Sequence, residues 1–396
     1  MIRTLLMKRT LMTKRALLIA ALFVLANTLA CEKMLLGPES DTVTPPSIHA
    51  SRLATILDSL RYAMDLPALA GAIVTDTGIV EARAAGCRRY GGPANVTDND
   101  QFHLGSCGKS FTSVALGLLV DQGKLRWEAT LPELFHEAAG AMRPEYRNVT
   151  LLDVLSHSAG FVRDAGITPQ PGTPTAQRAE IAAWALLQPP AIQHGAYLYS
   201  NLGFIIGGAI LERISGRTYE DVIMHDVVAP LGLTTAGFGP MGTPGLEDEP
   251  LQHSPSHAPI SPTGDAQLAP IYNPAGGLHM SVGDWGKYVR WVLATQSGAS
   301  APLLSPATAL MITTPRVATG DGGYYALGWG GAYYDQSAGG RTLSHSGSNG
   351  YNYCTAYIWL NRKIGFLVMS NQGAVGGDWP LGPALSRLVA FQANGN

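Results

Sequence analysis

The amino-acid sequence predicts an α+β fold, with one sheet built from both ends of the chain and a mostly helical region inserted into it. Two strand patterns joined by turn residues occur early, in ALAGAIVTDTGIVEARAAG at 68–86, and two more occur late, at 351–360 and 364–371. Between about 122 and 269 the patterns are mainly those of helices and loops. Strands are therefore expected to return only late in the chain, after the helical region.

Caps, turns and periodicity predict the other elements. A serine cap and an apolar face indicate a helix at 47–64, and residues 76–78 form the turn between the first two strands. Further helices are expected to start at Gly105, near 284–295 and at 383–391, the last with a proline in its first turn.

Composition sets the class of protein. The chain has 396 residues, of which 46% are hydrophobic and 14% charged, and its formal net charge is −2. Such a chain can bury a large core, and it lacks the clustered basic residues that nucleic-acid binding requires. We expect a globular protein with no nucleic-acid partner, divided into an α/β part at about 47–121 and 270–391 and a helical part at about 122–269.

The N-terminus predicts export. Basic residues precede the apolar run ALLIAALFVLANTLA, which has the order of a secretory signal peptide over residues 1–30 and is short for a membrane span. The run ends in Thr-Leu-Ala-Cys31, which resembles a bacterial lipoprotein box, with ordinary signal-peptidase cleavage as the alternative. Residues 31–46 have the composition of a tether. The expected location is the periplasm or cell envelope, with membrane attachment only through lipid on Cys31.

The cysteines do not predict a metal site or a complete disulfide framework. If Cys31 carries lipid, an odd number remains, Cys87, Cys107 and Cys354, and no Cys-x-x-Cys or Cys/His metal spacing occurs. Cys107 is interpreted as a small apolar residue, with pairing to Cys354 or Cys87 as the alternative. The sequence therefore gives little indication of a zinc or redox site.

A nucleophile with its own base is suggested by GSCGKSFTSVALGLLV, at 105–120. Among the lysines only Lys109 has a serine, Ser106, three residues earlier, and residues i and i+3 of a helix are neighbours on one surface. A lysine between apolar walls has its pKa pushed down, toward a state that can accept the serine proton. The alternative is a helix cap followed by a lysine that extends to solvent.

Two further motifs strengthen the catalytic interpretation. Tyr199-Ser200-Asn201 precedes an apolar helix, and His345-Ser346-Gly347 leads into a strand. With Ser-x-x-Lys, they resemble the hallmarks of the serine beta-lactamase and penicillin-binding-protein superfamily. Phrases such as VTLLDVLSHSAGF, YSNLGFIIGGAILERISGRTYED and NPAGGLHMSVGDWGKYV resemble its class C type members over about 47–391, including D-alanyl-D-alanine carboxypeptidases, D-amino-acid peptidases and carboxylesterases.

The resemblance implies a beta-lactamase-like fold, an antiparallel sheet flanked by helices plus a helical domain, with the active site between them. Ser106 would be the acylated nucleophile and Lys109 its activating partner. Tyr199 would relay a proton to the leaving group, helped by the nearby ammonium toward a phenolate or shared-proton state; a buried structural aromatic is the alternative.

The other implied roles concern substrate binding. Asn201 would hold the substrate's acyl-side amide or orient the lysine, with a helix cap as the alternative. His345 would lie on an edge strand and hydrogen-bond the substrate, and Gly347 would let that strand approach closely. The backbone N–H groups of Ser106 and Ser348 would form the oxyanion hole. The resemblance implies that no metal or organic cofactor is required. His157, in LSHSAGF, is interpreted as structural.

One departure from the family pattern bears on the substrate. The third motif begins with His345, where a lysine is more usual in class C beta-lactamases, and a histidine carries full positive charge only below its ordinary pKa of about 6.5. The sequence therefore favours a peptidase or esterase acting on short D-amino-acid peptides, cell-wall peptidoglycan or esters. A class C-type beta-lactamase, or a penicillin-binding sensor with negligible turnover, is the alternative.

Overall fold

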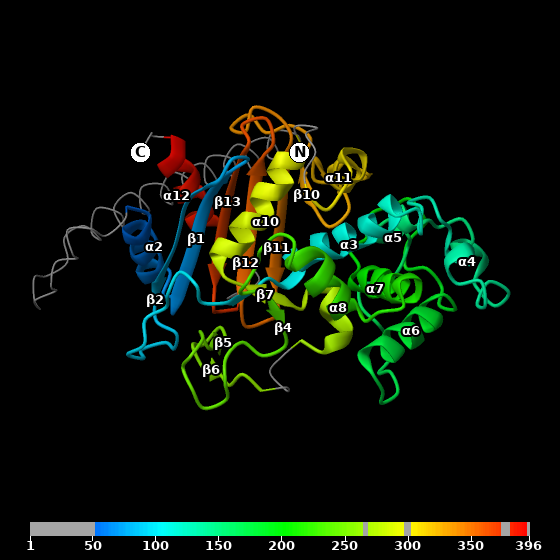
Figure 1. The fold of residues 1–396 in the computed structure, drawn as a ribbon, viewed down its shortest axis with the longest axis horizontal. Coiled ribbons are helices and arrows are strands. Elements are labelled where there is room, and N and C mark those ends of the chain that lie inside the picture. Colours follow the sequence, from blue (N-terminus) through cyan, green and yellow to red (C-terminus); the bar gives the residue numbers. More distant parts are fainter. Residues whose placement is uncertain (1–51, 264–267, 297–301, 374–380, 394–396) are drawn as a thin grey trace, which may run out of the picture. The chain divides into compact units, whose positions relative to one another are not determined.

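The computed structural model describes residues 52–263, 268–296, 302–373 and 381–393 (Figure 1). The predicted signal peptide at 1–30, the lipid site at Cys31 and the tether at 31–46 lie outside these ranges. Within them, no helix is both long enough and apolar enough to cross a bilayer.

The described residues form an eight-stranded sheet that is antiparallel at every pairing. Its spatial order is β2-β1-β13-β12-β11-β10-β9-β8. The strands are β1 (Ala68–Thr75), β2 (Ile79–Gly86), β8 (Val317–Ala318), β9 (Gly323–Tyr325), β10 (Gly330–Ala332), β11 (Thr342–Ser348), β12 (Tyr353–Trp359) and β13 (Ile364–Ser370).

The sheet joins the two ends of the sequence, which confirms the predicted fold class. β1 pairs with β13, so that Leu69 faces Ser370 across the ladder. The strands predicted at 68–86, 351–360 and 364–371 are present as β1, β2, β12 and β13. β13 is buried along its whole length and β1 along all but its last residue, because helices cover both faces of the sheet.

Helices α2 (Arg52–Ala63) and α12 (Gly382–Ala393) cover one face, and α10 (Val282–Thr295) lies across the other (Figure 1). Because successive strand residues point to opposite faces, β1 sends Leu69 and Ile73 toward α2 and Val74 toward α10. Two apolar cores result. The smaller one, under α2 and α12, includes Leu57 and Phe366.

The middle of the chain is mainly helical. It contains α3 (Lys109–Asp121), α4 (Leu131–Leu134), α5 (Leu151–Leu155), α6 (Pro174–Ala185), α7 (Asn201–Ser215) and α8 (Tyr219–Val222), followed by a π-helical turn at Ile223–Val228. Short 3₁₀ turns occur at η1 (Gly105–Gly108), η2 (Pro144–Tyr146) and η5 (Pro270–Tyr272), and later helices are α9 (Asn273–Gly276) and α11 (Pro306–Thr313).

The expectation that strands return only late is wrong. A small sheet joins β3 (Phe102–His103), β7 (Leu278–Met280) and β4 (Gly237–Phe238), and a two-stranded ribbon joins β5 (Gln252–His253) and β6 (Pro259–Ile260). These strands have two or three residues each, too few for an alternating pattern to show in the sequence. Neighbouring chain segments, rather than local preference, impose the extended conformation.

The helix predicted from Gly105 begins as the 3₁₀ turn η1 and becomes α-helical at Lys109. Nearly all of α3 is buried, including its polar residues Ser110, Thr112 and Ser113. Such a helix belongs to the centre of a protein, not to its surface. Ser106 and Lys109 therefore lie at the N-terminal end of a helix that runs through the interior of the protein.

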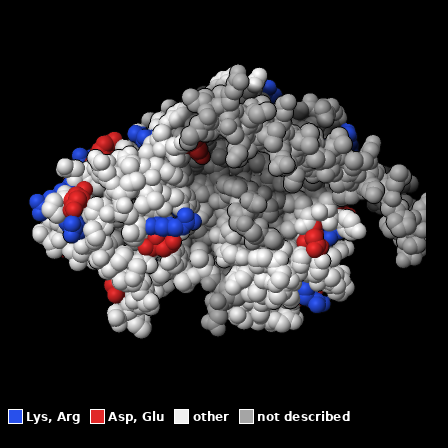
Figure 2. Space-filling view, turned by 180° about the vertical axis from the view of Figure 1, so that it is seen from behind, with Lys and Arg blue, Asp and Glu red and all other residues white. Residues whose placement is uncertain are grey.

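Charged side chains are sparse and mixed in sign. On the face shown in Figure 2, blue and red atoms lie in small separate groups among uncharged residues, with no continuous basic surface in the part that is coloured. The 14% content of charged residues accounts for this pattern. The absence of a nucleic-acid partner stays a prediction.

Candidate active site

Ser106 lies in η1, between strand β3 and helix α3. The turn is tight: Gly105 has a φ of +48°, and a Cβ atom there would come within 2.2 Å of the backbone nitrogen of Ser348. Only glycine combines that backbone conformation with that close approach. Gly105 therefore brings the serine turn into contact with the end of β11.

Lys109 is fully buried, and its ammonium nitrogen has three oxygen partners. Nζ donates to Ser106 Oγ at 3.1 Å, to Asn201 Oδ1 at 2.7 Å and to the carbonyl oxygen of Ala275 at 2.6 Å. Three acceptors match the three donors of an ammonium group. Burial lowers the pKa of Lys109 from its ordinary 10.5 to about 7, with smaller opposing contributions from neighbouring charges. Near neutral pH the group can lose its proton and act as a base toward Ser106.

Tyr199 lies over the same lysine, whose Nζ is 4.9 Å from the centre of the phenol ring. Burial raises the pKa of Tyr199, and a hydrogen bond with Ser106 lowers it by less. The phenol is therefore protonated at neutral pH, so the expectation that the lysine shifts it toward phenolate is not supported. A neutral phenol beside the nucleophile is suited to donating a proton.

His157 holds the segment that carries Tyr199, which agrees with its interpretation as a structural residue, although the sequence did not identify its partners. The N–H of Leu198 donates to the His157 carbonyl at 2.9 Å, and the N–H of Ser200 donates to His157 Nδ1 at 3.1 Å. The imidazole ring is 4.3 Å from the Tyr199 ring. Burial, with the lysine charge as a smaller cause, keeps the pKa of His157 well below 6.5, so Nδ1 is free to accept. A sequence signal existed only in the phrase LSHSAGF.

Asn201 begins helix α7 and bridges two groups. Its Oδ1 accepts from Lys109, and its Nδ2 donates to Asp164 Oδ1 at 2.8 Å. The helix cap belongs instead to Ser200, whose Oγ accepts from the N–H of Gly203 at 3.0 Å. The alternative interpretation of Asn201 as the side-chain cap is therefore wrong, and its position supports orienting the lysine.

Strand β11 brings the third motif to the nucleophile. A Cβ atom on Gly347 would come within 1.9 Å of the Leu104 carbonyl oxygen and within 2.8 Å of the Ser106 nitrogen. The backbone N–H groups of Ser106 and Ser348, predicted to form an oxyanion hole, thus lie at adjoining segments. β11 is not an edge strand, because β10 continues the sheet, although β10 pairs with it only at Ser344.

His345 already has two protein partners. Its Nε2 bonds the hydroxyl of Tyr325 at 2.9 Å, and its Nδ1 bonds the carbonyl oxygen of Ser346 at 2.7 Å. The ring is 9% exposed, whereas the side chain of Ser348 on the same strand is exposed. The geometry places His345 beside the nucleophile without leaving a ring nitrogen unpaired for substrate.

The cysteines of the described region are free thiols. Cys107 and Cys354 are buried, with their sulfur atoms 3.5 Å apart, and Cys107 Sγ also donates to the His345 carbonyl at 3.3 Å. Cys107 fills space behind Ser106, as expected. Among the described residues, no group of three or more His, Cys, Asp or Glu side chains could hold a metal ion.

A cavity of about 930 Å³ opens over Ser106. It is rich in tyrosine and glycine, and the Asp, Glu, Lys and Arg side chains in its lining are Arg163 and Asp321. The tyrosines are Tyr197, Tyr199, Tyr324, Tyr325, Tyr334, Tyr353 and Tyr357. A cavity of this size is within the range of small-molecule binding sites. Some of its phenol groups are already bonded within the protein, Tyr324 to the Thr342 carbonyl and Tyr325 to His345, and the lining carries little fixed charge.

Comparisons with known proteins agree with this geometry. The family model described as Beta-lactamase matches residues 55–391. Penicillin-binding protein 4 of Amycolatopsis lactamdurans is 25% identical over 335 residues, which cover 80% of this chain and 84% of that protein. An unguisins hydrolase of Aspergillus campestris is 25% identical over 306 residues, covering 70% of this chain but only 53% of that protein.

Solved structures of other proteins have a similar fold. The class C beta lactamase of Rhodobacter sphaeroides superposes with a TM-score of 0.70 at 16% identity, covering 86% of this chain and 99% of that one. At that identity the likeness concerns the fold alone. The match of the family model across most of the sequence goes further: this chain belongs to the Beta-lactamase family, a family of serine hydrolases.

Proposed function

We propose that this protein is a serine hydrolase that works through an acyl-enzyme on Ser106, acting as a D-alanyl-D-alanine carboxypeptidase, D-amino-acid peptidase or carboxylesterase. The observation that carries the proposal is the buried Lys109, whose amine is 3.1 Å from the Ser106 hydroxyl and has a pKa of about 7. A lysine that only stabilised the fold would not require a desolvated position beside a serine.

The chemistry follows from the proton positions. Neutral Lys109 takes the Ser106 proton while Oγ bonds to the substrate carbonyl carbon, and the N–H groups of Ser106 and Ser348 stabilise the oxyanion. Tyr199 gives its proton to the departing amine or alcohol as the carbonyl bond to that group breaks, and the Lys109 ammonium restores the proton. Water then takes the place of the departed amine or alcohol. Its oxygen bonds to the ester carbonyl carbon while its proton goes to Tyr199, which passes its own proton to Lys109. Ser106 Oγ then leaves and regains its proton from Lys109.

The cavity supports the choice of substrate. Tyrosine is the most frequent side chain bearing a polar group in the lining. The two charged side chains, Arg163 and Asp321, have opposite signs, so the lining has no cluster of positive or negative charge. His345 is bonded to Tyr325 and provides no fixed cation of the kind a lysine would give for a substrate carboxylate, which favours esters and D-amino-acid amides over beta-lactams and D-Ala-D-Ala peptides alike. A class C-type beta-lactamase or a penicillin-binding sensor is therefore the second candidate, supported by the likeness to penicillin-binding protein 4.

Intact mass spectrometry after mixing with benzylpenicillin tests the proposal and separates these candidates. A long-lived adduct that is absent in Ser106→Ala indicates a penicillin-binding peptidase or sensor, and D-Ala-D-Ala peptide turnover decides between them. Rapid loss of the drug without an adduct indicates a beta-lactamase. If wild type neither binds nor turns over the drug, short esters or D-Ala-D-Ala peptides in a Ser106-dependent manner, the proposal is wrong.

We also propose that the protein is exported to the periplasm or cell envelope and anchored by lipid on Cys31. The support is the basic-then-apolar order of residues 1–30 and the Thr-Leu-Ala-Cys sequence that ends it. Cell fractionation should place the wild type with membranes and Cys31→Ser in the soluble envelope fraction. Recovery of both proteins from the cytoplasm would contradict export.

A further inference from the structure

The chain segment at 270–277 supplies one wall of the nucleophile site. Its Ala275 carbonyl accepts the shortest of the three hydrogen bonds from Lys109 Nζ, at 2.6 Å. Gly276 lies against the serine turn, where a Cβ atom would come within 2.7 Å of the Gly105 carbonyl carbon. Because η5 and α9 are single turns, they cannot hold this geometry by themselves.

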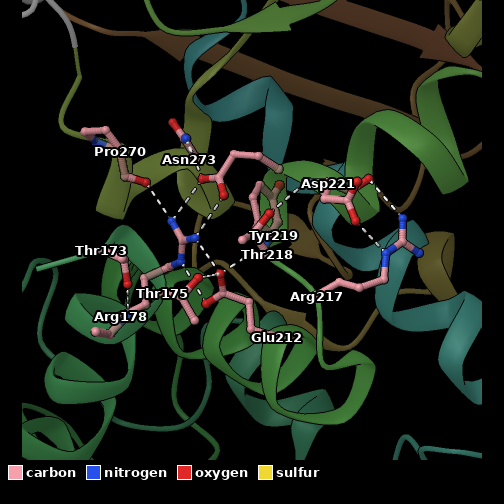
Figure 3. A network of polar contacts seen from close by, with 12 residues as sticks. Thr173, Thr175, Arg178, Glu212, Arg217, Thr218, Tyr219, Asp221, Pro270 and Asn273 are labelled. Atoms are coloured by element: carbon pink, nitrogen blue, oxygen red, sulfur yellow. Dashed lines mark hydrogen bonds and ion pairs between the residues drawn. The ribbon is translucent and has the colours of Figure 1, made fainter.

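A buried ionic cluster secures the start of that segment (Figure 3). Arg178 of α6 is fully buried, and its Nη1 donates to the Pro270 carbonyl at 2.8 Å and to Glu220 Oε1 at 3.1 Å. Glu220 Oε1 also accepts from Asn273 Nδ2 at 2.7 Å. Arg178 and Glu220 therefore hold the segment at residues 270 and 273, just before Ala275.

The other side of Arg178 is closed by Glu212, which accepts from Nε at 3.0 Å and from Nη2 at 2.6 Å. A single guanidinium is thus shared by two carboxylates and a backbone carbonyl. Arg178 and Glu212 are buried, whereas the side chain of Glu220 is 26% exposed. Taking the two buried charges out of water costs several kcal/mol per ion, and an apolar replacement of the same shape is often no less stable. Stability alone therefore does not account for the cluster. Its contacts with Pro270 and Asn273 suggest that it positions the 270–276 segment.

We propose that Arg178, Glu220 and Asn273 are positioning residues for the active site: they fix the 270–276 segment so that the Ala275 carbonyl holds the Lys109 amine against Ser106. The inference rests on the proposed function of Ser106 as nucleophile. None of the three side chains is among those lining the substrate cavity. Their loss should therefore slow acylation while leaving substrate binding nearly unchanged.

The chain offers a matched control on the same helix. Asp221 follows Glu220 in α8 and also pairs with an arginine, accepting from Arg217 Nε at 2.6 Å. This pair is visible beside the cluster in Figure 3, and both side chains are partly exposed. Asp221→Asn thus removes one carboxylate charge one position away without touching the Arg178 contacts.

The experiment follows p-nitrophenyl acetate hydrolysis by the whole protein, measuring the limiting rate constant of Ser106 acylation and the half-saturating ester concentration. Glu220→Gln and Asn273→Ala should lower the acylation rate constant by roughly tenfold or more, because misplacement of a catalytic group by about 1 Å can cost about a hundredfold and each variant removes only part of the support. The half-saturating concentration should stay within about twofold. Asp221→Asn should match the wild type in both quantities.

Two comparisons keep the result interpretable. Asn273→Ala leaves Arg178 paired with both carboxylates, so it tests positioning even if Glu220→Gln folds poorly, and thermal unfolding of each variant records the folded fraction. Wild-type acylation rates in folded Asn273→Ala, or equal losses in Asp221→Asn, would overturn the positioning role. If wild type and Ser106→Ala hydrolyse the ester equally, the proposed function itself fails, and this inference falls with it.

Discussion

Lys109 is the residue whose environment most directly sets the behaviour of the site. Its pKa is lowered to about 7 by burial, so the amine is mostly protonated below that pH and mostly neutral above it. If the neutral amine activates Ser106, the acylation rate should rise with pH and reach half of its maximum near pH 7. Stopped-flow acylation between pH 5 and 9 measures this. A rate constant that still rises about tenfold per pH unit at pH 9, as an unshifted lysine with a pKa of 10.5 would give, would contradict the assignment.

The same burial should cost stability. Because the pKa of Lys109 is lower in the folded than in the unfolded protein, the unfolded chain binds the extra proton between about pH 7 and 10.5. The penalty is full below pH 7 and shrinks as pH rises. Lys109→Met should therefore be inactive, and the margin between its free energy of unfolding and that of wild type should move in favour of wild type as pH rises above 7, by up to about 1.4 kcal/mol per pH unit.

Urea unfolding of both proteins at pH 6, 7.5 and 9 measures the margin. The comparison with wild type at each pH cancels the titration of other groups that the substitution leaves unchanged. A margin that stays constant across this range would show that the lysine keeps its ordinary pKa in the folded state.

Among single residues, the sequence could predict those whose partners lie nearby in the chain. Ser106 and Lys109 are one helical turn apart, so their meeting follows from helix geometry. The Ala275 carbonyl and the ring of His157 act through contacts that only the tertiary fold creates. A backbone carbonyl leaves no trace in residue type, so the Ala275 contact could not be predicted. The interpretation of His157 as structural is correct, but its partners at Leu198 and Ser200 depend on the tertiary fold.

The serine turn η1 depends on the close approach of two backbones. Gly105→Ala would force a Cβ atom to within 2.2 Å of the Ser348 nitrogen at a φ of +48°, so the turn and β11 must separate. Acylation should fall by about a hundredfold or more, since the oxyanion donors move apart. Gly108→Ala, in the same turn, meets its nearest neighbour only at 3.5 Å and should stay within a few fold of wild type.

Burst kinetics and thermal unfolding of the two alanine variants provide the measurement. Equal activity in both would show that the contact between η1 and β11 has no role in acylation. Equal loss in both would assign the effect to the turn in general.

For whole elements, prediction succeeded where a pattern repeats and failed where it cannot. β1, β12 and β13 have seven or eight residues and buried apolar runs, and the sequence located them. β10 consists of Gly-Gly-Ala and has almost no intrinsic strand preference. It becomes a strand because Gly330 is paired with Tyr325 of β9 on one side and with Ser344 of β11 on the other.

Over the whole molecule, the sheet separates a purely structural core from the site. Leu57 of α2 is fully buried in the smaller core, on the side of the sheet that α2 and α12 cover. Leu57→Ala should lower the free energy of unfolding by about 2 to 5 kcal/mol. Its acylation rate per folded molecule should equal that of wild type, measured by active-site titration alongside urea unfolding. A specific loss of rate at full folding would contradict this separation.

The pairing of β1 with β13 also means that the sheet cannot be completed until nearly the whole chain has been synthesised. Leu69 and its partner Ser370 are 301 positions apart (370 − 69), so at about 5 to 20 residues per second the first strand waits roughly 15 to 60 s for its neighbour to be made. During that interval one edge of the apolar β1–β2 hairpin is open to pairing with other chains. We therefore expect the nascent chain to need a chaperone, or to stay unfolded, until β13 has been made and can pair with β1.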